Sequence, residues 1–175
     1  NLLLLKKIMK KLLMGLFITA TIGACKNQDA NNSNQEGVSN GKPSNIEIVK
    51  EINNDLVAYD FEKLQSHYND STLVHDNLKI ETIGKNLQGF IPLKNAGVQF
   101  GIEGNPMIYE VINHKQDTLN GGYPSYVFTY ITFSATKAGV KKIFKCSQIF
   151  GMKDGKVLEE WDTYDTVPVM ELMKN

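Results

Sequence analysis

The sequence contains no arginine, only two cysteines and no excess of either charge. All 19 basic residues are lysines, and they balance 19 acidic residues. Without arginine the chain lacks the planar fork that binds a phosphate or carboxylate through two parallel hydrogen bonds. A balanced charge argues against a nucleic-acid-binding protein, which usually has a basic excess, and two cysteines are too few for a disulfide framework. We therefore expect no nucleic-acid partner.

The zero net charge is the sum of two unlike parts. Residues 1–24 hold four lysines and no acidic residue, which leaves 15 lysines against 19 acidic residues in the remainder. Met9-Lys10-Lys11 precedes an apolar run from Leu12 to Ala24, and this order is typical of a secretory signal peptide. The run has 13 residues, fewer than the ~20 that span a bilayer, so a transmembrane anchor or a buried helix is the less favoured reading.

The apolar run ends in Ile22-Gly23-Ala24-Cys25, which resembles the bacterial lipobox. In that motif the cysteine is lipidated and becomes the new N-terminus, and several acyl chains give a stable membrane anchor. Residues 26–43 contain Val38 as their only sizeable apolar side chain, which favours a flexible tether. We expect a signal peptide over 1–24 (with Met9 as an alternative start), lipidated Cys25 and a tether over 25–43, and a folded domain over 44–175. The protein would then lie in the bacterial cell envelope, outside the cytoplasm.

The folded part is predicted to begin with helices. Ser44 and Glu47 form a capping-box pattern, and apolar residues then recur at helical spacing as far as Tyr59. A second helix is expected from Asp60 to Tyr68, and a third from Gly84 to Phe90, ended by Pro92. Short strands are expected at 72–76 and 78–83, and 101–105 reads as a loop.

After residue 105 the apolar pattern changes to a period of two. The predicted strands are 107–114, 123–136, 140–152 and 156–164, with hairpin turns at Asn120-Gly121-Gly122 and at Asp154-Gly155. Helices followed by long hairpins predict an α+β domain with helices covering one face of a curved antiparallel sheet. Both faces of these strands are apolar, so the second face is expected either to pack on another subunit, giving a homodimer, or to enclose a cavity.

The order of these elements resembles the nuclear transport factor 2-like superfamily, which includes SnoaL-like and ketosteroid-isomerase-like proteins. The resemblance covers residues 45–166 and depends on the joint order of short segments, none of them specific alone. It implies a cone: a strongly bent sheet wrapped around the N-terminal helices, with a pocket at the wide end. The segments are Asp60-Phe61-Glu62-Lys63-Leu64, Tyr68-Asn69-Asp70, Val74-His75-Asp76, Gly84-Lys85 and 150–157.

The resemblance also implies a catalytic residue. Asp76 falls where ketosteroid-isomerase-like enzymes have the aspartate that removes a proton next to a carbonyl. The positions of that family's oxyanion donors fall near Ile52 or Asn53 and near Ser147, which leaves the matching set incomplete. The alternative is that Asp76 only caps the turn after its strand.

Four further residues are candidates for binding a ligand: Tyr130, Gln148, Glu159 and Trp161. Trp161 could stack on a flat ligand with Glu159 beside it, or it could fill the core or a dimer interface. Glu160, Asp162 and Tyr164 would share the opposite face of that strand.

No metal site or cofactor is expected, because the histidines and cysteines lack the spacing of metal ligands. Cys146 lies in an apolar strand pattern and is read as a buried, inert thiol. Three functions remain open: a lipid-anchored module that binds a small apolar ligand or a protein partner; a SnoaL-like isomerase, cyclase or dehydratase with Asp76 as general base; and a structural dimeric envelope lipoprotein. The first is favoured because the catalytic set is incomplete.

Overall fold

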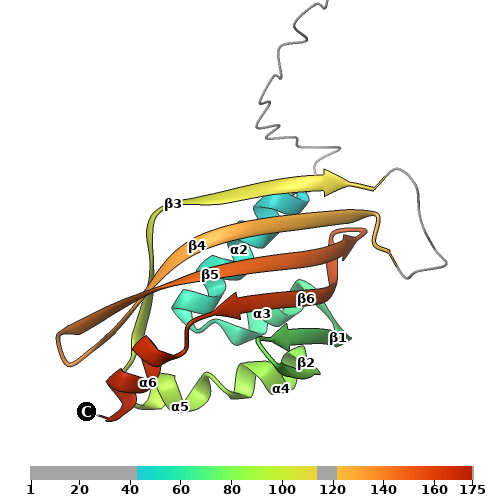
Figure 1. Ribbon diagram of the computed structural model, residues 1–175. Coiled ribbons are helices and arrows are strands. Elements are labelled where there is room, and N and C mark those ends of the chain that lie inside the picture. The colour runs from blue at the N-terminus through green and yellow to red at the C-terminus, as the bar shows by residue number, and fades with distance from the viewer. Residues whose placement is uncertain (1–42, 114–121, 175) are drawn as a thin grey trace, which may run out of the picture. The chain divides into compact units, whose positions relative to one another are not determined.

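The computed structural model describes residues 43–113 and 122–174. These residues form an α+β fold built on one curved, unclosed, six-stranded sheet, which confirms the predicted fold class. The strand order is β2-β1-β6-β5-β4-β3, and all neighbours are antiparallel except β1 and β6. Figure 1 shows the sheet with its helices. The strands are β1 (Tyr68–Asp76), β2 (Lys79–Thr82), β3 (Gln99–Ile112), β4 (Ser125–Lys137), β5 (Val140–Lys153) and β6 (Lys156–Tyr164).

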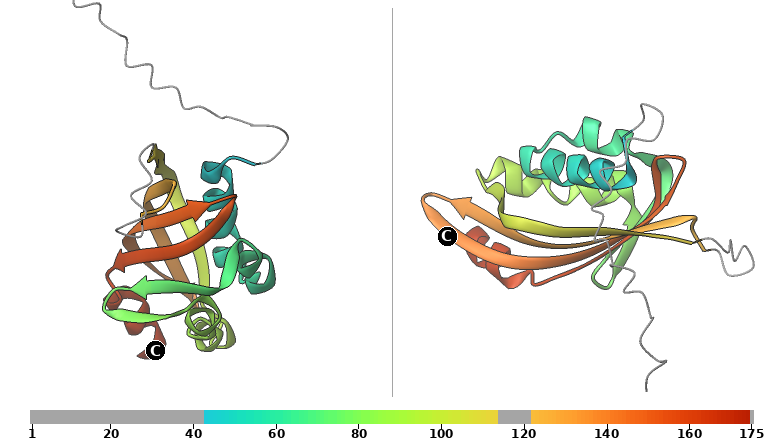
Figure 2. Two further views of the ribbon diagram at one scale, coloured as in Figure 1. Left: turned by 90° about the vertical axis from the view of Figure 1, so that its right-hand side faces the viewer. Right: turned by 90° about the horizontal axis from the view of Figure 1, so that it is seen from above.

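The helices pack against the concave face of the sheet, as both views in Figure 2 show. The longest of the described helices, α2, begins at the predicted capping box: the hydroxyl of Ser44 accepts from the backbone N–H of Glu47, and the Glu47 carboxylate accepts from the backbone N–H of Ser44 at 2.8 Å. None of the described helices is long and apolar enough to cross a membrane. The helices are α2 (Asn45–Ala58), α3 (Phe61–Ser66), α4 (Ile83–Gln88), α5 (Ile91–Asn95) and α6 (Val167–Lys174).

Two local predictions are wrong, and one helix was not predicted. Pro92 does not end a helix but lies in the first turn of α5, where its missing N–H costs nothing. Residues 101–105 are not a loop but part of β3, which pairs with β4 on both sides of an irregularity between Glu103 and Met107. The C-terminal helix α6 was not predicted; its Leu172 packs with Val98 and Ala135 on the concave side.

The main core lies between α2 and the narrower part of the sheet. Val49 and Ile52 of α2 meet Val127, Phe150 and Val157, and each of these side chains is at most 2% exposed. Two smaller buried clusters lie outside this main core, one with Val98, Ala135 and Leu172 and the other with Ile131, Phe133 and Cys146. Phe133 and Cys146 also line a cavity on the concave face. The predicted signal peptide, Cys25, the tether up to Lys42 and the turn at Asn120-Gly121 lie outside the described residues.

Candidate active site

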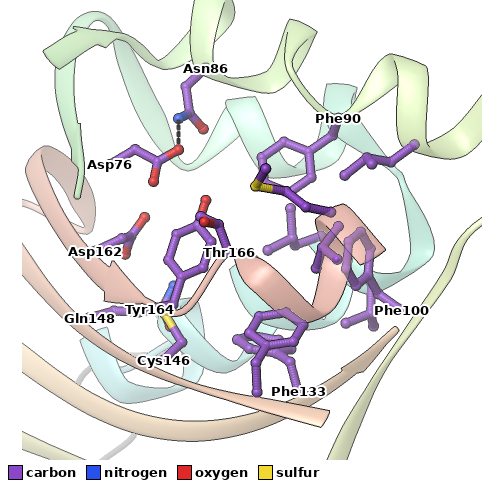
Figure 3. Close-up of a pocket in the computed structure, with 16 residues that line it drawn as sticks. Asp76, Asn86, Phe90, Phe100, Phe133, Cys146, Gln148, Asp162, Tyr164 and Thr166 are labelled. Atoms are coloured by element: carbon purple, nitrogen blue, oxygen red, sulfur yellow. Dashed lines mark hydrogen bonds between the residues drawn. The ribbon is translucent and has the colours of Figure 1, made fainter. Parts of the chain in front are cut away.

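A cavity of about 320 Å³ lies between the sheet, α2, α5 and α6. Its polar lining groups gather on one side and its aromatic and aliphatic groups on the other (Figure 3). The volume is at the small end of the range for ligand pockets, ~300–1,000 Å³. The apolar lining is Leu56, Val57, Phe90, Leu93, Phe100, Phe133, Phe144, Cys146, Val169 and Met170; the polar lining is Asp76, Asn86, Gln148, Asp162, Tyr164 and Thr166.

The polar side is assembled by strand register. Asp76, the last residue of β1, is the partner of Asp162 on β6, and Asp162 is in turn the partner of Gln148 on β5. Cross-strand partners share one face of a sheet, so all three side chains point to the concave side. The next inward pair along these strands is Cys146 and Tyr164.

The half-buried carboxylate of Asp76 accepts hydrogen bonds from side chains around it, among them the Tyr164 hydroxyl. The amide of Asn86, on α4, donates to its Oδ2 at 3.4 Å, and the amide of Asn77 donates weakly to Oδ1 at 3.5 Å. Burial and the charge of Asp76 raise the pKa of the Tyr164 hydroxyl. Tyr164 therefore keeps its proton at neutral pH and can donate a hydrogen bond beside Asp76.

The environment of Asp162 disfavours a charge on its carboxyl. Burial raises the pKa of the Asp162 carboxyl well above its usual range, with further contributions from Glu160 and Asp76. Burial also raises the pKa of Glu160, to about 7, although the Tyr68 hydroxyl donates to it at 2.7 Å. Glu160 and Asp162 therefore retain protons near neutrality. We call the cluster that these two carboxyls form with Asp76 the acidic end of the cavity.

Cys146 and Gln148 complete the wall beside this acidic end. Burial raises the pKa of the Cys146 thiol, and nearby Asp162, Glu160 and Asp76 add to the shift, so the thiol is not a thiolate nucleophile. The Gln148 carbonyl accepts from Thr129 at 2.9 Å, which fixes the orientation of its amide. That amide stabilises the charged form of Asp162.

Two of the predicted site residues, Asp76 and Gln148, line the cavity; Tyr130, Glu159 and Trp161 do not. Trp161 stacks on His75, with ring centroids 5.3 Å apart, and His75 Nε2 lies 2.6 Å from Glu159 Oε1. Tyr130 is 43% exposed. Side chains alternate along a strand, and these residues have the parity that faces away from Asp162 and Gln148.

The residues missed by sequence reasoning are Asn86, Asp162 and Tyr164. The sequence does contain a signal for two of them: Asp162 and Tyr164 share one face of β6 with Glu160, whereas Trp161 lies on the other face. Among the described residues, no group of three or more histidine, cysteine or acidic side chains has a geometry that could hold a metal ion.

No family model and no curated protein matches the sequence. Solved structures do match the fold. A proposed polyketide cyclase from Pseudomonas putida covers 75% of this chain and 98% of its own, at 10% identity and a TM-score of 0.55. A proposed SnoaL-like polyketide cyclase from Shewanella putrefaciens covers 76% and 98%, at 14% identity and a TM-score of 0.54. A proposed isomerase from Bacillus subtilis covers 73% and 91%, at 11% identity and a TM-score of 0.54.

The fold is the SnoaL-like cone. Identities this low support the architecture that the sequence resemblance implied, and they carry no activity over to this chain.

Proposed function

We propose that this domain binds one small, mainly apolar molecule in the cone, with the polar group of that molecule at the acidic end. The observation that supports it is the division of the cavity: ten of its lining residues are apolar or Cys146, and the polar ones lie together around Asp76 and Asp162. Pockets of this kind gain affinity from apolar burial and orientation from a few polar groups.

The test is to close the cavity without disturbing the core. Met170 lines the cavity yet is 54% exposed, so Met170→Trp can be accommodated while its ring narrows the entrance. Met173→Trp is the matched control, since Met173 lies on the same helix, is 38% exposed and does not line the cavity. We expect the neutral fluorophore prodan to bind the native protein and Met173→Trp, and to bind Met170→Trp at least about tenfold more weakly. Equal binding by both variants would show that the probe does not occupy the cone.

A second candidate is acid–base catalysis, favoured by the unlike environments of two neighbouring carboxyls. Asp76 is half-buried, whereas Asp162 and Tyr164 keep their protons. A carboxylate beside two neutral donors can remove a proton next to a carbonyl while the donors stabilise the developing enolate oxygen. The structural matches include proposed cyclases and a proposed isomerase, so the fold is compatible with this reading.

Catalysis is tested by proton exchange. With β-tetralone in D₂O, we expect the protein to speed deuterium uptake at the carbons next to the carbonyl, and Asp76→Asn to abolish the effect. Asp70→Asn is the control because Asp70 is an exposed carboxylate on the same strand. An Asp76→Asn variant as active as the native protein would exclude Asp76 as the base.

The lipid anchor at Cys25 remains a proposal beside these two. It would hold the cone at the outer side of a membrane, at the end of the tether. A purely structural dimeric lipoprotein stays the third alternative, and loss of prodan binding in Met170→Trp would count against it.

A further inference from the structure

No cation lines the acidic end of the cavity: none of the cavity-lining residues in the described part of the chain is a lysine or a histidine, and the chain has no arginine. Lys79 is the cross-strand partner of Asp76, but its ammonium pairs with Glu81 at 2.6 Å. Lys85 also lies near Glu81, at 3.9 Å. A buried carboxylate without a counter-ion is costly unless it is protonated or meets a cation from elsewhere.

Asp162 also has an unused acceptor. Its Oδ1 is buried and accepts no hydrogen bond in the structure, although Asp162 lines the cavity. A buried acceptor left unpaired costs free energy, and rotation of the carboxyl that turns Oδ1 toward the cavity would let a donor on a ligand recover it. An N–H donor with a positive charge would satisfy the hydrogen bond and the charge together.

We propose, building on the ligand-binding function above, that the ligand is a small apolar amine whose protonated nitrogen lies between Asp76 and Asp162. The opposite wall suits the rest of such a molecule. Aromatic rings attract cations through their faces and also bury hydrocarbon. The rings that line the cavity are Phe90, Phe100, Phe133, Phe144 and Tyr164.

Binding of a cation here is linked to release of a proton. Burial raises the pKa of Asp162 and brings that of Glu160 to about 7, so the cluster must lose a proton before it can pair fully with the amine. The affinity for the amine should therefore rise as pH rises through neutrality, until the amine itself loses its proton. The titratable groups near Asp162 are Tyr68 and Asp76 of β1, Cys146 of β5, and Glu160 and Tyr164 of β6. On the elements next to Asp76, β2 adds Lys79 and Glu81, and α4 adds Lys85, which pairs with Glu81, and the neutral amide of Asn86.

The test compares probes of one shape and different charge on the purified full chain by titration calorimetry. The probes are phenethylamine, phenethyl alcohol, benzylacetone and hydrocinnamate. At about pH 8 we expect phenethylamine to bind at least about tenfold more tightly than the alcohol or the ketone. Hydrocinnamate should bind most weakly, because its carboxylate would face like charges. Repeating the titration in buffers of different ionisation enthalpy should reveal proton release with the amine alone.

Two variants test whether Asp162 causes the preference for the amine. Asp162→Asn should lower amine affinity to the level of the alcohol while leaving alcohol binding intact. Asp165→Asn is the matched control: it removes an exposed carboxylate three positions along the chain, and asparagine can still accept from the backbone N–H of Val167. The inference is overturned if the alcohol or ketone binds as tightly as the amine, or if Asp162→Asn keeps the preference. Either result would overturn the amine preference and leave the proposed ligand-binding function standing. If none of the four probes binds, both the ligand-binding function and the amine preference are overturned.

Discussion

Asp76 and Asp162 are register partners on the only two parallel neighbours of the sheet, β1 and β6. Their side chains enter one cavity, yet Asp76 is half-buried with two amide donors, while Oδ1 of Asp162 is buried and unpaired. Glu160 lies two residues before Asp162 on the same face and does not line the cavity. The protonation of the acidic end is therefore a property of three carboxyls, only two of which a ligand could touch.

Glu160→Gln tests this arrangement through stability. Burial raises the pKa of Glu160 to about 7 in the folded protein, against about 4.3 in an unfolded chain. The folded state thus binds more protons than the unfolded state between these values, so the free energy of unfolding falls as pH rises through this window. Glutamine stays neutral and can still accept from Tyr68. We expect Glu160→Gln to unfold less easily than the native protein above neutrality, by on the order of 1–3 kcal/mol, and to show a flatter pH dependence in urea titrations.

Glu62→Gln is the control for that experiment, since Glu62 is an exposed carboxylate on α3. Its pH dependence should match that of the native protein. If Glu160→Gln has the same slope as the native protein as well, Glu160 does not keep its proton in the folded state.

The sequence predicted those parts of the fold that have local signals. The capping box at Ser44 defines the start of α2, and Asp154-Gly155 adopts the positive φ values, 52° and 76°, that a tight hairpin needs. Helix α6 was missed because it has only eight residues, and exposed Val167 and Met170 are as apolar as buried Leu172. A short apolar segment does not distinguish a helix from a strand by its periodicity.

The sequence predicted only part of the candidate site, because it does not show which face of each strand points into the cavity. Alternation along β6 separates Trp161 from Asp162, but it does not say which of the two faces inward. That choice comes from register with β5, where Gln148 is the partner of Asp162 and is itself 4% exposed. The register depends on turn geometry and on the irregularity between Gly151 and Met152, neither of which can be read from residue types alone.

The convex face of the sheet should form a homodimer interface. Its side chains include exposed Met107, Tyr109, Val111, Tyr130 and Ile143, and the ring of Tyr109 stacks on that of Phe128 with centroids 5.1 Å apart. A contiguous apolar surface of this kind is typical of protein interfaces. We expect light scattering to give a dimer for the native protein and a monomer for Tyr109→Lys.

The control for the dimer is Ile91→Lys, which places the same charge on an exposed apolar residue of α5, away from the sheet face. This variant should remain a dimer. A native protein that is monomeric at all accessible concentrations would disprove the interface.

Cys25→Ala tests the proposed anchor. A thioether-linked and acylated cysteine at the end of the signal peptide would keep the protein with the membrane fraction, because more than one acyl chain gives stable attachment. We expect Cys25→Ala to move the protein to the soluble fraction and to remove lipid mass from its N-terminal peptide. Cys146→Ala should stay in the membrane fraction, since the thiol of Cys146 is buried in the fold. Membrane retention of Cys25→Ala would rule out lipidation at this residue.

Gly151 makes the close approach of the Tyr123 ring to β5 possible. A Cβ at Gly151 would overlap ring atoms of Tyr123, whose hydroxyl donates to Glu159 on the neighbouring strand. Gly151→Ala must displace this ring, so we expect it to lower the free energy of unfolding by about 1–3 kcal/mol. In Tyr123→Ala the ring is absent, so adding Gly151→Ala to that variant should lower the free energy of unfolding much less. Urea titrations of the native protein, the two single variants and the double variant give the coupling energy between the two positions.

Gly84→Ala is the control for a glycine without such a neighbour. The nearest heavy atom to a Cβ there is Gln65 Nε2 at 3.7 Å, and the residue lies inside α4, so alanine should be neutral or stabilising by up to about 1 kcal/mol. If Gly151→Ala lowers the free energy of unfolding by the same amount with and without the Tyr123 ring, that ring is not the obstacle to a Cβ at Gly151.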